Sequence, residues 1–157
     1  MDAVILNTAS HTKLVAGLCR DIAVASWRPE IIVGIDDGII AAVMVGKYLN
    51  VPYIHAVGDG YLNYLGEDAM GYERRPSNIL VISDTQSPAR ISALIDNWQQ
   101  SCLPSDERWN TVWNHNVRFA AVVDRTYLRE CPVKMDYSGM ETFEGRVIFP
   151  YNDWWTK

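Results

Sequence analysis

Three aspartates of this 157-residue chain stand where a sheet of parallel strands would present its ligand-binding edge. Asp36, Asp84 and Asp124 each follow a short apolar run, of the kind found in strands buried on both faces. Ligands of open parallel sheets bind outside the carboxyl ends of the strands. If these strands are neighbours, the carboxylates converge on one crevice that suits Mg²⁺ or the hydroxyl and amino groups of a nucleoside. The alternative is that each aspartate only caps the helix that follows it.

A second candidate site is the segment 83–90 (SDTQSPAR), which joins an apolar run to a helical pattern. Backbone N–H groups at such a junction can hold an anion, and Arg90 could add a positive charge. Ser87 followed by Pro88 is a strong helix start. The segment contains no glycine, so its backbone cannot easily form a close phosphate cradle. The alternative is a capped helix with a solvated arginine.

The elements that would position these residues alternate between short apolar runs and helical patterns. Strands separated by helices imply right-handed crossovers, and therefore an α/β fold with a mainly parallel, twisted sheet flanked by helices. Residues 59–77 are predicted to form a long loop or irregular hairpin. The chain is predicted to be a single domain with a core at about 10–126 and a tail at about 127–157. Strands are predicted at 31–35, 53–57, 79–82, 119–123 and 147–149, and helices from a cap at Ser10 to about Trp27, from about 39 to 49, and around 91–98.

Composition excludes several classes of partner. The formal net charge is -5 and no run of five basic residues occurs, so neither nucleic acid nor an anionic membrane would be attracted. Three cysteines are an odd count without metal-ligand spacing, which favours reduced thiols in a cytoplasmic protein. No apolar run approaches the ~20 residues of a membrane span, and the first residues do not resemble a signal peptide.

Taken in order, these segments resemble the type I phosphoribosyltransferases, and the tail resembles the purine-salvage branch (hypoxanthine, guanine and xanthine-guanine enzymes). Residues 31–42 (IIVGIDDGIIAA) resemble the first strand and pyrophosphate loop, and 78–95 (NILVISDTQSPARISALI) resemble the strand, phosphoribosyl-diphosphate loop and helix. Residues 119–153 are similar to the base-binding hood and the closing strand. The resemblance runs from about Leu14 to Asp153. It implies a small C-terminal hood, a purine-type base, nucleoside or nucleotide as ligand, Mg²⁺ as a candidate metal, no organic cofactor, and a homo-oligomer.

The resemblance also implies which residues bind the ligand. Tyr137 would be the aromatic residue that stacks on a base. Asp84 is the candidate catalytic residue and, with Glu144, a candidate metal ligand. The full set of implied ligand-binding residues is Asp36, Asp37, Gly38, Asp84, Thr85, Gln86, Ser87, Arg90, Asp124, Arg125 and Tyr137.

The departures from the family pattern lie mainly in the phosphate-binding parts. Ser83 replaces the first of two adjacent acids, Ser87 replaces the proposed general base, and residues 88–91 (PARI) replace Thr-Gly-x-Thr. Asp37 stands in the pyrophosphate loop, and Asp124 aligns with the lysine that reads the purine carbonyl. Each lost contact to a charged group would cost about 1.5–3 kcal/mol. A base-binding slot beside a degraded phosphate slot is therefore expected.

Three hypotheses follow from the sequence. The first is a phosphoribosyltransferase-fold protein that binds a purine-type base, nucleoside or nucleotide and has weak or no transferase activity. The second is an active, divergent purine phosphoribosyltransferase that uses phosphoribosyl diphosphate and Mg²⁺. The third is a structural or interaction module that kept only the fold.

Overall fold

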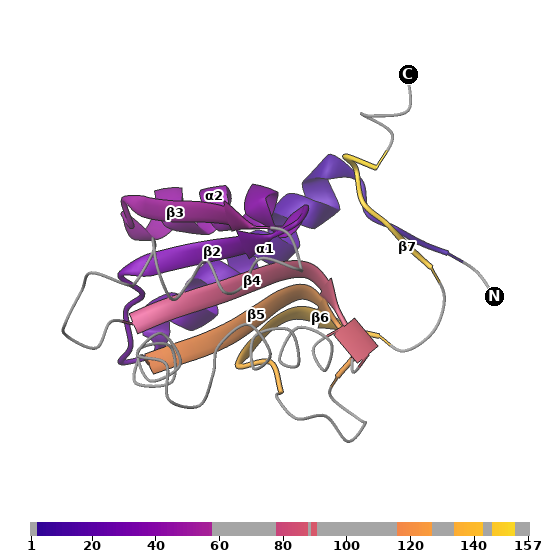
Figure 1. Ribbon diagram of the computed structural model, residues 1–157. Helices are drawn as coiled ribbons and strands as arrows, with labels where there is room; N and C mark the ends of the chain where they lie inside the picture. Colours follow the sequence, from indigo (N-terminus) through magenta and orange to yellow (C-terminus); the bar gives the residue numbers. More distant parts are fainter. Residues whose placement is uncertain are drawn as a thin grey trace.

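The computed structural model describes residues 3–57, 78–87, 89–90, 116–126, 134–142 and 146–152 of the chain (Figure 1). The predicted loop at 59–77 and the predicted helix around 91–98 lie outside these ranges.

A five-stranded parallel sheet forms the centre of the protein (Figure 1). Its strand order is β3-β2-β4-β5-β6, and every neighbouring pair is parallel. This confirms the predicted fold class, and β6, which no sequence pattern predicted, adds an edge strand. The bounds are β2 Ile31–Ile35, β3 Tyr53–Val57, β4 Asn78–Gln86, β5 Asn116–Asp124 and β6 Tyr137–Glu141.

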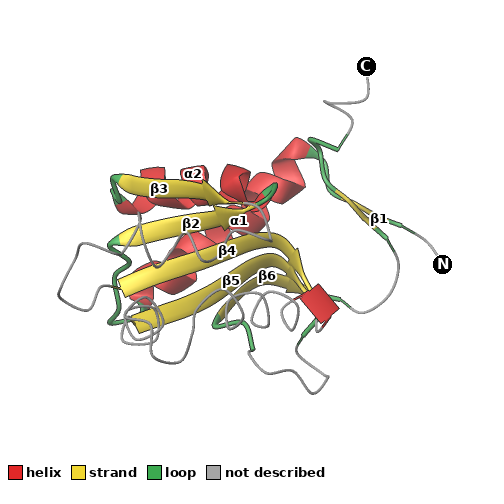
Figure 2. Cartoon of the chain, in the orientation of Figure 1, coloured by secondary structure: helices red, strands yellow, loops and turns green. Residues whose placement is uncertain are grey.

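Two helices, α1 (Thr8–Val24) and α2 (Gly38–Leu49), pack against each other and against the sheet. Figure 2 shows them on the same side of the strands. The prediction that Ser10 caps α1 is wrong. Asn7 is the cap, because its backbone is extended and its Oδ1 accepts from the Ser10 N–H at 2.8 Å.

The core lies between these helices and the sheet. Apolar side chains recur on α1 with helical spacing, and the strands contribute alternate residues, as the periods of 3.6 and 2 require. Full burial of a large aliphatic side chain stabilises the fold by about 1.5–3 kcal/mol. Central members of this cluster are Leu18, Ile22, Val45, Ile32, Leu80, Ile82 and Val122.

A second, two-stranded sheet joins the two ends of the described chain. β1 (Val4–Ile5) pairs in parallel with β7 (Val147–Ile148), and the prediction of a strand near 147–149 is thereby confirmed. Figure 1 shows this small sheet on the side toward which the arrows of the main sheet point. The turn after β7 therefore lies near the carboxyl ends of the central strands. No helix of the described residues is long and apolar enough to cross a membrane.

Candidate ligand-binding site

Two of the three predicted aspartates meet at the carboxyl ends of neighbouring strands. Ile35 at the end of β2 pairs with Ser83 of β4, so the following residues, Asp36 and Asp84, stand at the same edge of the sheet. Arg90 connects them: its Nη2 lies 3.6 Å from Asp36 Oδ2, and its Nη1 lies 3.6 Å from Asp84 Oδ1. The guanidinium therefore offsets the repulsion that two adjacent carboxylates would otherwise feel.

Asp84 is the most enclosed charged group of this site, with 14% of its side chain exposed. Its Oδ1 accepts a hydrogen bond from the Thr85 N–H at 2.6 Å. Burial raises the pKa of Asp84 above its ordinary value, although the Thr85 N–H and the Arg90 guanidinium act in the opposite direction. Desolvation of the charged form thus outweighs its local stabilisation.

Tyr151 contacts Asp84, and His11 packs against Tyr151. Neither residue was predicted from the sequence. The Tyr151 hydroxyl donates to Asp84 Oδ2 at 3.4 Å, and burial together with the nearby Asp84 charge raises the pKa of Tyr151. The Tyr151 ring stacks on Phe149 at 5.3 Å, and the His11 ring meets Tyr151 edge-on at 5.6 Å. Burial lowers the pKa of His11. The available signal was the sequence Phe-Pro-Tyr at 149–151, which lies within the segment that resembles the closing strand.

In the segment that resembles the phosphoribosyl-diphosphate loop, several hydrogen-bond donors bind acceptors within the segment itself. β4 continues through Gln86 instead of giving way to a loop before Asp84, because Thr85 and Gln86 still pair with Val123 and Asp124 of β5. The Thr85 N–H donates to Asp84 Oδ1, as described above. The Ser87 N–H donates to Gln86 Oε1 at 3.2 Å.

Farther along the same segment, the Arg90 N–H donates to Ser87 Oγ at 3.2 Å, which confirms the predicted Ser87 cap. Arg90 Nη1 also donates to the Thr85 carbonyl at 2.6 Å. Gln86, predicted to bind ligand, is instead buried, with its Nε2 donating to Ser83 Oγ at 3.3 Å. The backbone N–H groups of Thr85, Ser87 and Arg90 thus already have acceptors.

Asp124 lies at the same edge of the sheet but does not join this pair. It is 3% exposed, and its Oδ1 accepts from the Thr126 N–H at 2.7 Å and the Thr126 hydroxyl at 2.6 Å. Its Oδ2 accepts from the Ser138 hydroxyl at 2.8 Å. The expected crevice of three carboxylates is therefore corrected to a pair. The adjacent Arg125 continues the β-ladder through its N–H, which donates to the Gln86 carbonyl at 2.9 Å.

The position of Tyr137 differs from the one expected for a residue that stacks on a base. It begins β6, where it pairs with Ala120, and its hydroxyl accepts from Arg118 Nη1 at 2.7 Å. Its ring packs 6.5 Å from Trp27, and the Arg118 guanidinium lies 4.7 Å from the Trp27 ring centre. These partners lie toward the amino ends of β2 and β5. Tyr137 thus packs against Trp27 and Arg118, away from the carboxyl edge where the Asp36–Asp84 pair lies.

The start of α2 is packed directly on β4. A Cβ on Gly38 would lie 2.5 Å from the Ile82 carbonyl oxygen and 2.8 Å from Ser83 Cα, so only glycine fits. Asp36 turns the chain into α2 with a φ of 51°, a left-handed conformation that aspartate tolerates better than most residues. Asp37 occupies the cap position without a side-chain capping bond. The close packing places the Asp37 charge near enough to raise the pKa of Asp84.

The described residues do not fit a magnesium site of their own. They contain no group of three or more His, Cys, Asp or Glu side chains that could hold a metal ion. Arg90 stands between the two carboxylates that a cation would have to share. Glu144, the other candidate ligand, lies outside the described residues.

Comparison with known proteins identifies the fold. No protein-family model matches the sequence, and no curated protein matches it. Among solved structures, a purine phosphoribosyltransferase from Pyrococcus horikoshii matches with a TM-score of 0.65 and 15% identity, covering 97% of this chain and 95% of that one. The chain has the fold of the purine phosphoribosyltransferases.

Two further solved structures are similar to this chain. The xanthine-guanine-hypoxanthine phosphoribosyltransferase of Helicobacter pylori matches with a TM-score of 0.66 and 11% identity, covering 98% of this chain and 93% of that one. A hypothetical protein from Neisseria gonorrhoeae with bound ppGpp matches with a TM-score of 0.68 and 16% identity, covering 96% of this chain and 89% of that one. At such identities the likeness describes the backbone, and function must be argued from the site.

Proposed function

We propose that this phosphoribosyltransferase-fold protein binds a purine-type base, nucleoside or nucleotide at the Asp36–Asp84 pair and has weak or no transferase activity. The fold supports the ligand class, since similar structures include purine phosphoribosyltransferases and a protein with bound ppGpp. Carboxylates accept hydrogen bonds from the hydroxyl and amino groups of a nucleoside. Asp36, with 46% of its side chain exposed, is accessible to such a ligand.

One observation supports weak transfer above all others: three backbone donors of the segment that would hold a sugar phosphate, and its arginine, already have partners. The N–H groups of Thr85, Ser87 and Arg90 donate to side chains of their own segment. The Arg90 guanidinium contacts Asp36, Asp84 and the Thr85 carbonyl. A phosphate would have to displace these contacts and approach two carboxylates, and hydrogen bonds to charged groups are worth about 1.5–3 kcal/mol each. A ligand with few or no phosphates avoids most of this cost.

The remaining expectations are part of the proposal. The protein would act in the cytoplasm, as a homo-oligomer, with a small molecule as its partner and without nucleic acid or membrane. Mg²⁺ would take part only together with a phosphate-bearing ligand, because that ion is commonly held by one or two carboxylates plus ligand phosphates.

Titration calorimetry tests the binding part. Purine bases, nucleosides, nucleotides and phosphoribosyl diphosphate are each titrated with and without Mg²⁺. We expect a base or nucleoside to bind, and Asp84→Asn and Asp36→Asn to weaken it at least tenfold, which corresponds to about 1.4 kcal/mol. Asp21→Asn removes the same charge from an exposed position on α1 and should leave the affinity unchanged. No heat with any of these compounds would end the proposal.

A pyrophosphate-release assay tests the catalytic part. Ordinary enzymes turn over at about 1–10³ s⁻¹. If transfer is weak or absent, we expect turnover far below about 1 s⁻¹. Turnover within that range, lost in Asp84→Ala, would favour an active divergent transferase instead. A large assembly in light scattering, without any ligand binding, would favour a structural or interaction module.

A further inference from the structure

A groove between α1 and β6 is separate from the Asp36–Asp84 pair and is lined by different kinds of side chain. Its volume is about 390 Å³, and it is lined by residues of α1, of β6 and of the link between β1 and α1. Volumes of about 300–1,000 Å³ with mostly apolar walls and a few polar groups are typical of small-molecule sites. None of its lining residues belongs to the candidate site above.

The groove is on a face of α1 that the core does not use. His11, Leu18 and Ile22 of α1 are buried, whereas Lys13, Leu14, Gly17 and Arg20 line the groove. At about 100° per residue, Lys13, Gly17 and Arg20 project from the other side of the helix than the buried residues do. Leu14, between the two sides, supplies an apolar wall.

Two glycines line the groove: Gly17 leaves space open on the helix, and Gly139 allows α1 to pack closely on β6. A Cβ on Gly17 would have only Arg20 Nη2 near it, at 3.8 Å, so the space above this residue is free. Gly139 of β6 lies close under α1, since a Cβ there would be 3.3 Å from Leu14 Cβ and 2.6 Å from the Val122 carbonyl oxygen. Leu14 and Met140 add apolar surface beside them. A ligand with an apolar body can therefore lie directly on these residues, the floor of the groove.

Two cations face the same groove. Lys13 and Arg20 are seven residues apart, which is two helical turns or about 10 Å along the axis. Both side chains are exposed, and neither makes an ion pair within the part of the chain that the structure describes. In a protein with a net charge of -5, a place with two unpaired cations over an apolar floor is locally suited to an anion.

We propose that this groove is a binding site for a small amphipathic organic anion, with the apolar body on Gly17, Leu14 and Met140 and a phosphate or carboxylate held by Lys13 and Arg20. The apolar floor and the two cations together determine the class of ligand. A bare anion would gain nothing from the apolar walls, and a neutral compound would gain nothing from the cations. This site is independent of the proposed purine site and would stand if that proposal failed.

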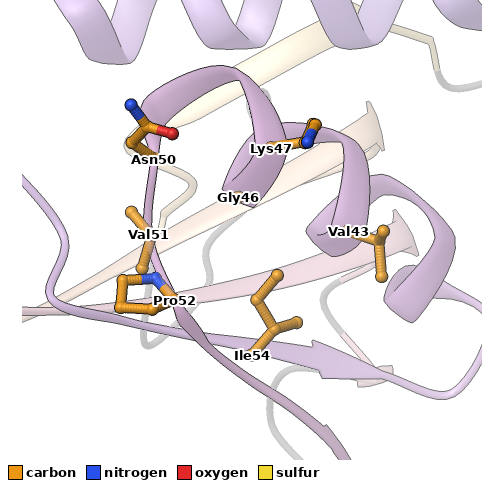
Figure 3. Close-up of a pocket in the computed structure, with 7 residues that line it drawn as sticks. All are labelled: Val43, Gly46, Lys47, Asn50, Val51, Pro52 and Ile54. Carbon is orange, nitrogen blue, oxygen red and sulfur yellow. The ribbon is translucent and has the colours of Figure 1, made fainter.

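A second groove provides a matched comparison. It lies at the end of α2 and is lined by Val43, Gly46, Lys47 and Ile54, among others, with a volume of about 270 Å³. Figure 3 shows that Lys47 is the single cation among its labelled residues. Lys47→Ala therefore removes one positive charge from an apolar groove elsewhere on the protein.

The test follows the backbone amide chemical shifts of the ¹⁵N-labelled full chain by NMR. The protein is titrated separately with anilinonaphthalene sulfonate, AMP, octanoate and inorganic phosphate. We expect saturable shifts at Gly17 and Gly139 with anilinonaphthalene sulfonate and with AMP or octanoate, and none with inorganic phosphate. Whichever of AMP and octanoate binds more tightly assigns the anion to the nucleotides or to the acyl carboxylates. Binding at Gly38 alone, with Gly17 unmoved, would overturn the proposal.

Variants separate the floor from the charges. Gly17→Leu places a side chain in the free space above the floor, and leucine is a better helix former than glycine, so this variant should fold and lose binding. Lys13→Ala with Arg20→Ala should weaken binding at least tenfold, whereas Lys47→Ala should change it less than twofold. Unchanged affinity in a folded Gly17→Leu protein, or equal losses in the double variant and Lys47→Ala, would refute the site.

Discussion

The hydroxyl of Tyr151 lies 3.4 Å from Oδ2 of Asp84, so the turn after β7 reaches the acid at the centre of the candidate site. Tyr151 is 1% exposed and is fixed by Phe149 and His11 around its ring. The start of α1 and the turn after β7 therefore meet beside the Asp84 carboxylate. The environment of Asp84 thus depends on Tyr151 and His11, which are both buried.

Replacing Tyr151 separates its hydroxyl from its ring. Tyr151→Phe keeps the stacking on Phe149 and should cost about 0.5–1.5 kcal/mol of unfolding free energy, the usual value of one hydrogen bond. Tyr151→Ala empties a fully buried position and should cost about 3–5 kcal/mol. Urea unfolding followed by fluorescence measures both. Equal losses in the two variants would show that the ring contributes nothing beyond the hydroxyl.

Asp84 should make the protein less stable as the pH rises through the pKa of this carboxyl in the folded state. Burial raises that pKa above the ordinary value of 3.8, so the folded protein binds the proton more tightly than the unfolded chain does. The associated stability is complete below the unfolded pKa and is lost as the pH rises through the folded pKa. Asp84→Asn is neutral at every pH. It should therefore be more stable than the wild type at pH 7, with a difference that shrinks toward pH 4.

Thermal unfolding across that pH range measures the effect of Asp84→Asn. Asp21→Asn, at an exposed position, is the control for removing one negative charge from a protein that already carries a net charge of -5. A less stable Asp84→Asn protein at pH 7 would mean that the contacts with Arg90 and Thr85 outweigh the cost of burial.

Much of the fold was predictable because local patterns and tertiary packing agree along most of the chain. The β-branched run at 31–35 is buried on every residue of β2, and the helix predicted to end near Leu49 does so, closed by Asn50 in the left-handed conformation. β6 was missed because only its first residue is buried: the next three have intermediate burial and Glu141 is exposed. Such a short edge strand is defined by its partner β5 and by α1 above it, and not by its own composition.

The site was only partly predictable, because the sequence gives strand ends but not side-chain partners. The carboxyl-edge rule placed Asp36 and Asp84 at one edge of the sheet, and both contact Arg90 there. Asp124 follows the same pattern, yet Thr126 and Ser138 satisfy its oxygens and remove it from the site. The Ser138 contact depends on the unexpected strand β6, so no local pattern could have revealed it.

Asp124 should matter for stability and not for ligand binding. Its carboxylate accepts three hydrogen bonds in a buried place. Asp124→Ala leaves those donors without an acceptor, at about 1–3 kcal/mol for each unsatisfied group. We expect a loss of about 2–5 kcal/mol in urea unfolding and unchanged affinity of the folded fraction for any purine ligand. A tenfold loss of affinity in a protein of wild-type stability would return Asp124 to the binding site.

Two glycines at helical positions should respond oppositely to the same substitution. Gly38→Ala puts a methyl group 2.5 Å from the Ile82 carbonyl oxygen and 2.8 Å from Ser83 Cα, both main-chain atoms of β4 that cannot move aside cheaply. Overpacking of this kind costs about 1–3 kcal/mol, and here it would also push α2 and Asp37 away from Asp84. Gly17→Ala meets only the end of the Arg20 side chain at 3.8 Å, so it should stabilise the protein by about 0.4–1 kcal/mol through the unfolded state. Urea unfolding of both variants measures the contrast, and a Gly38→Ala protein as stable as the wild type would show that α2 can retreat from the sheet without cost.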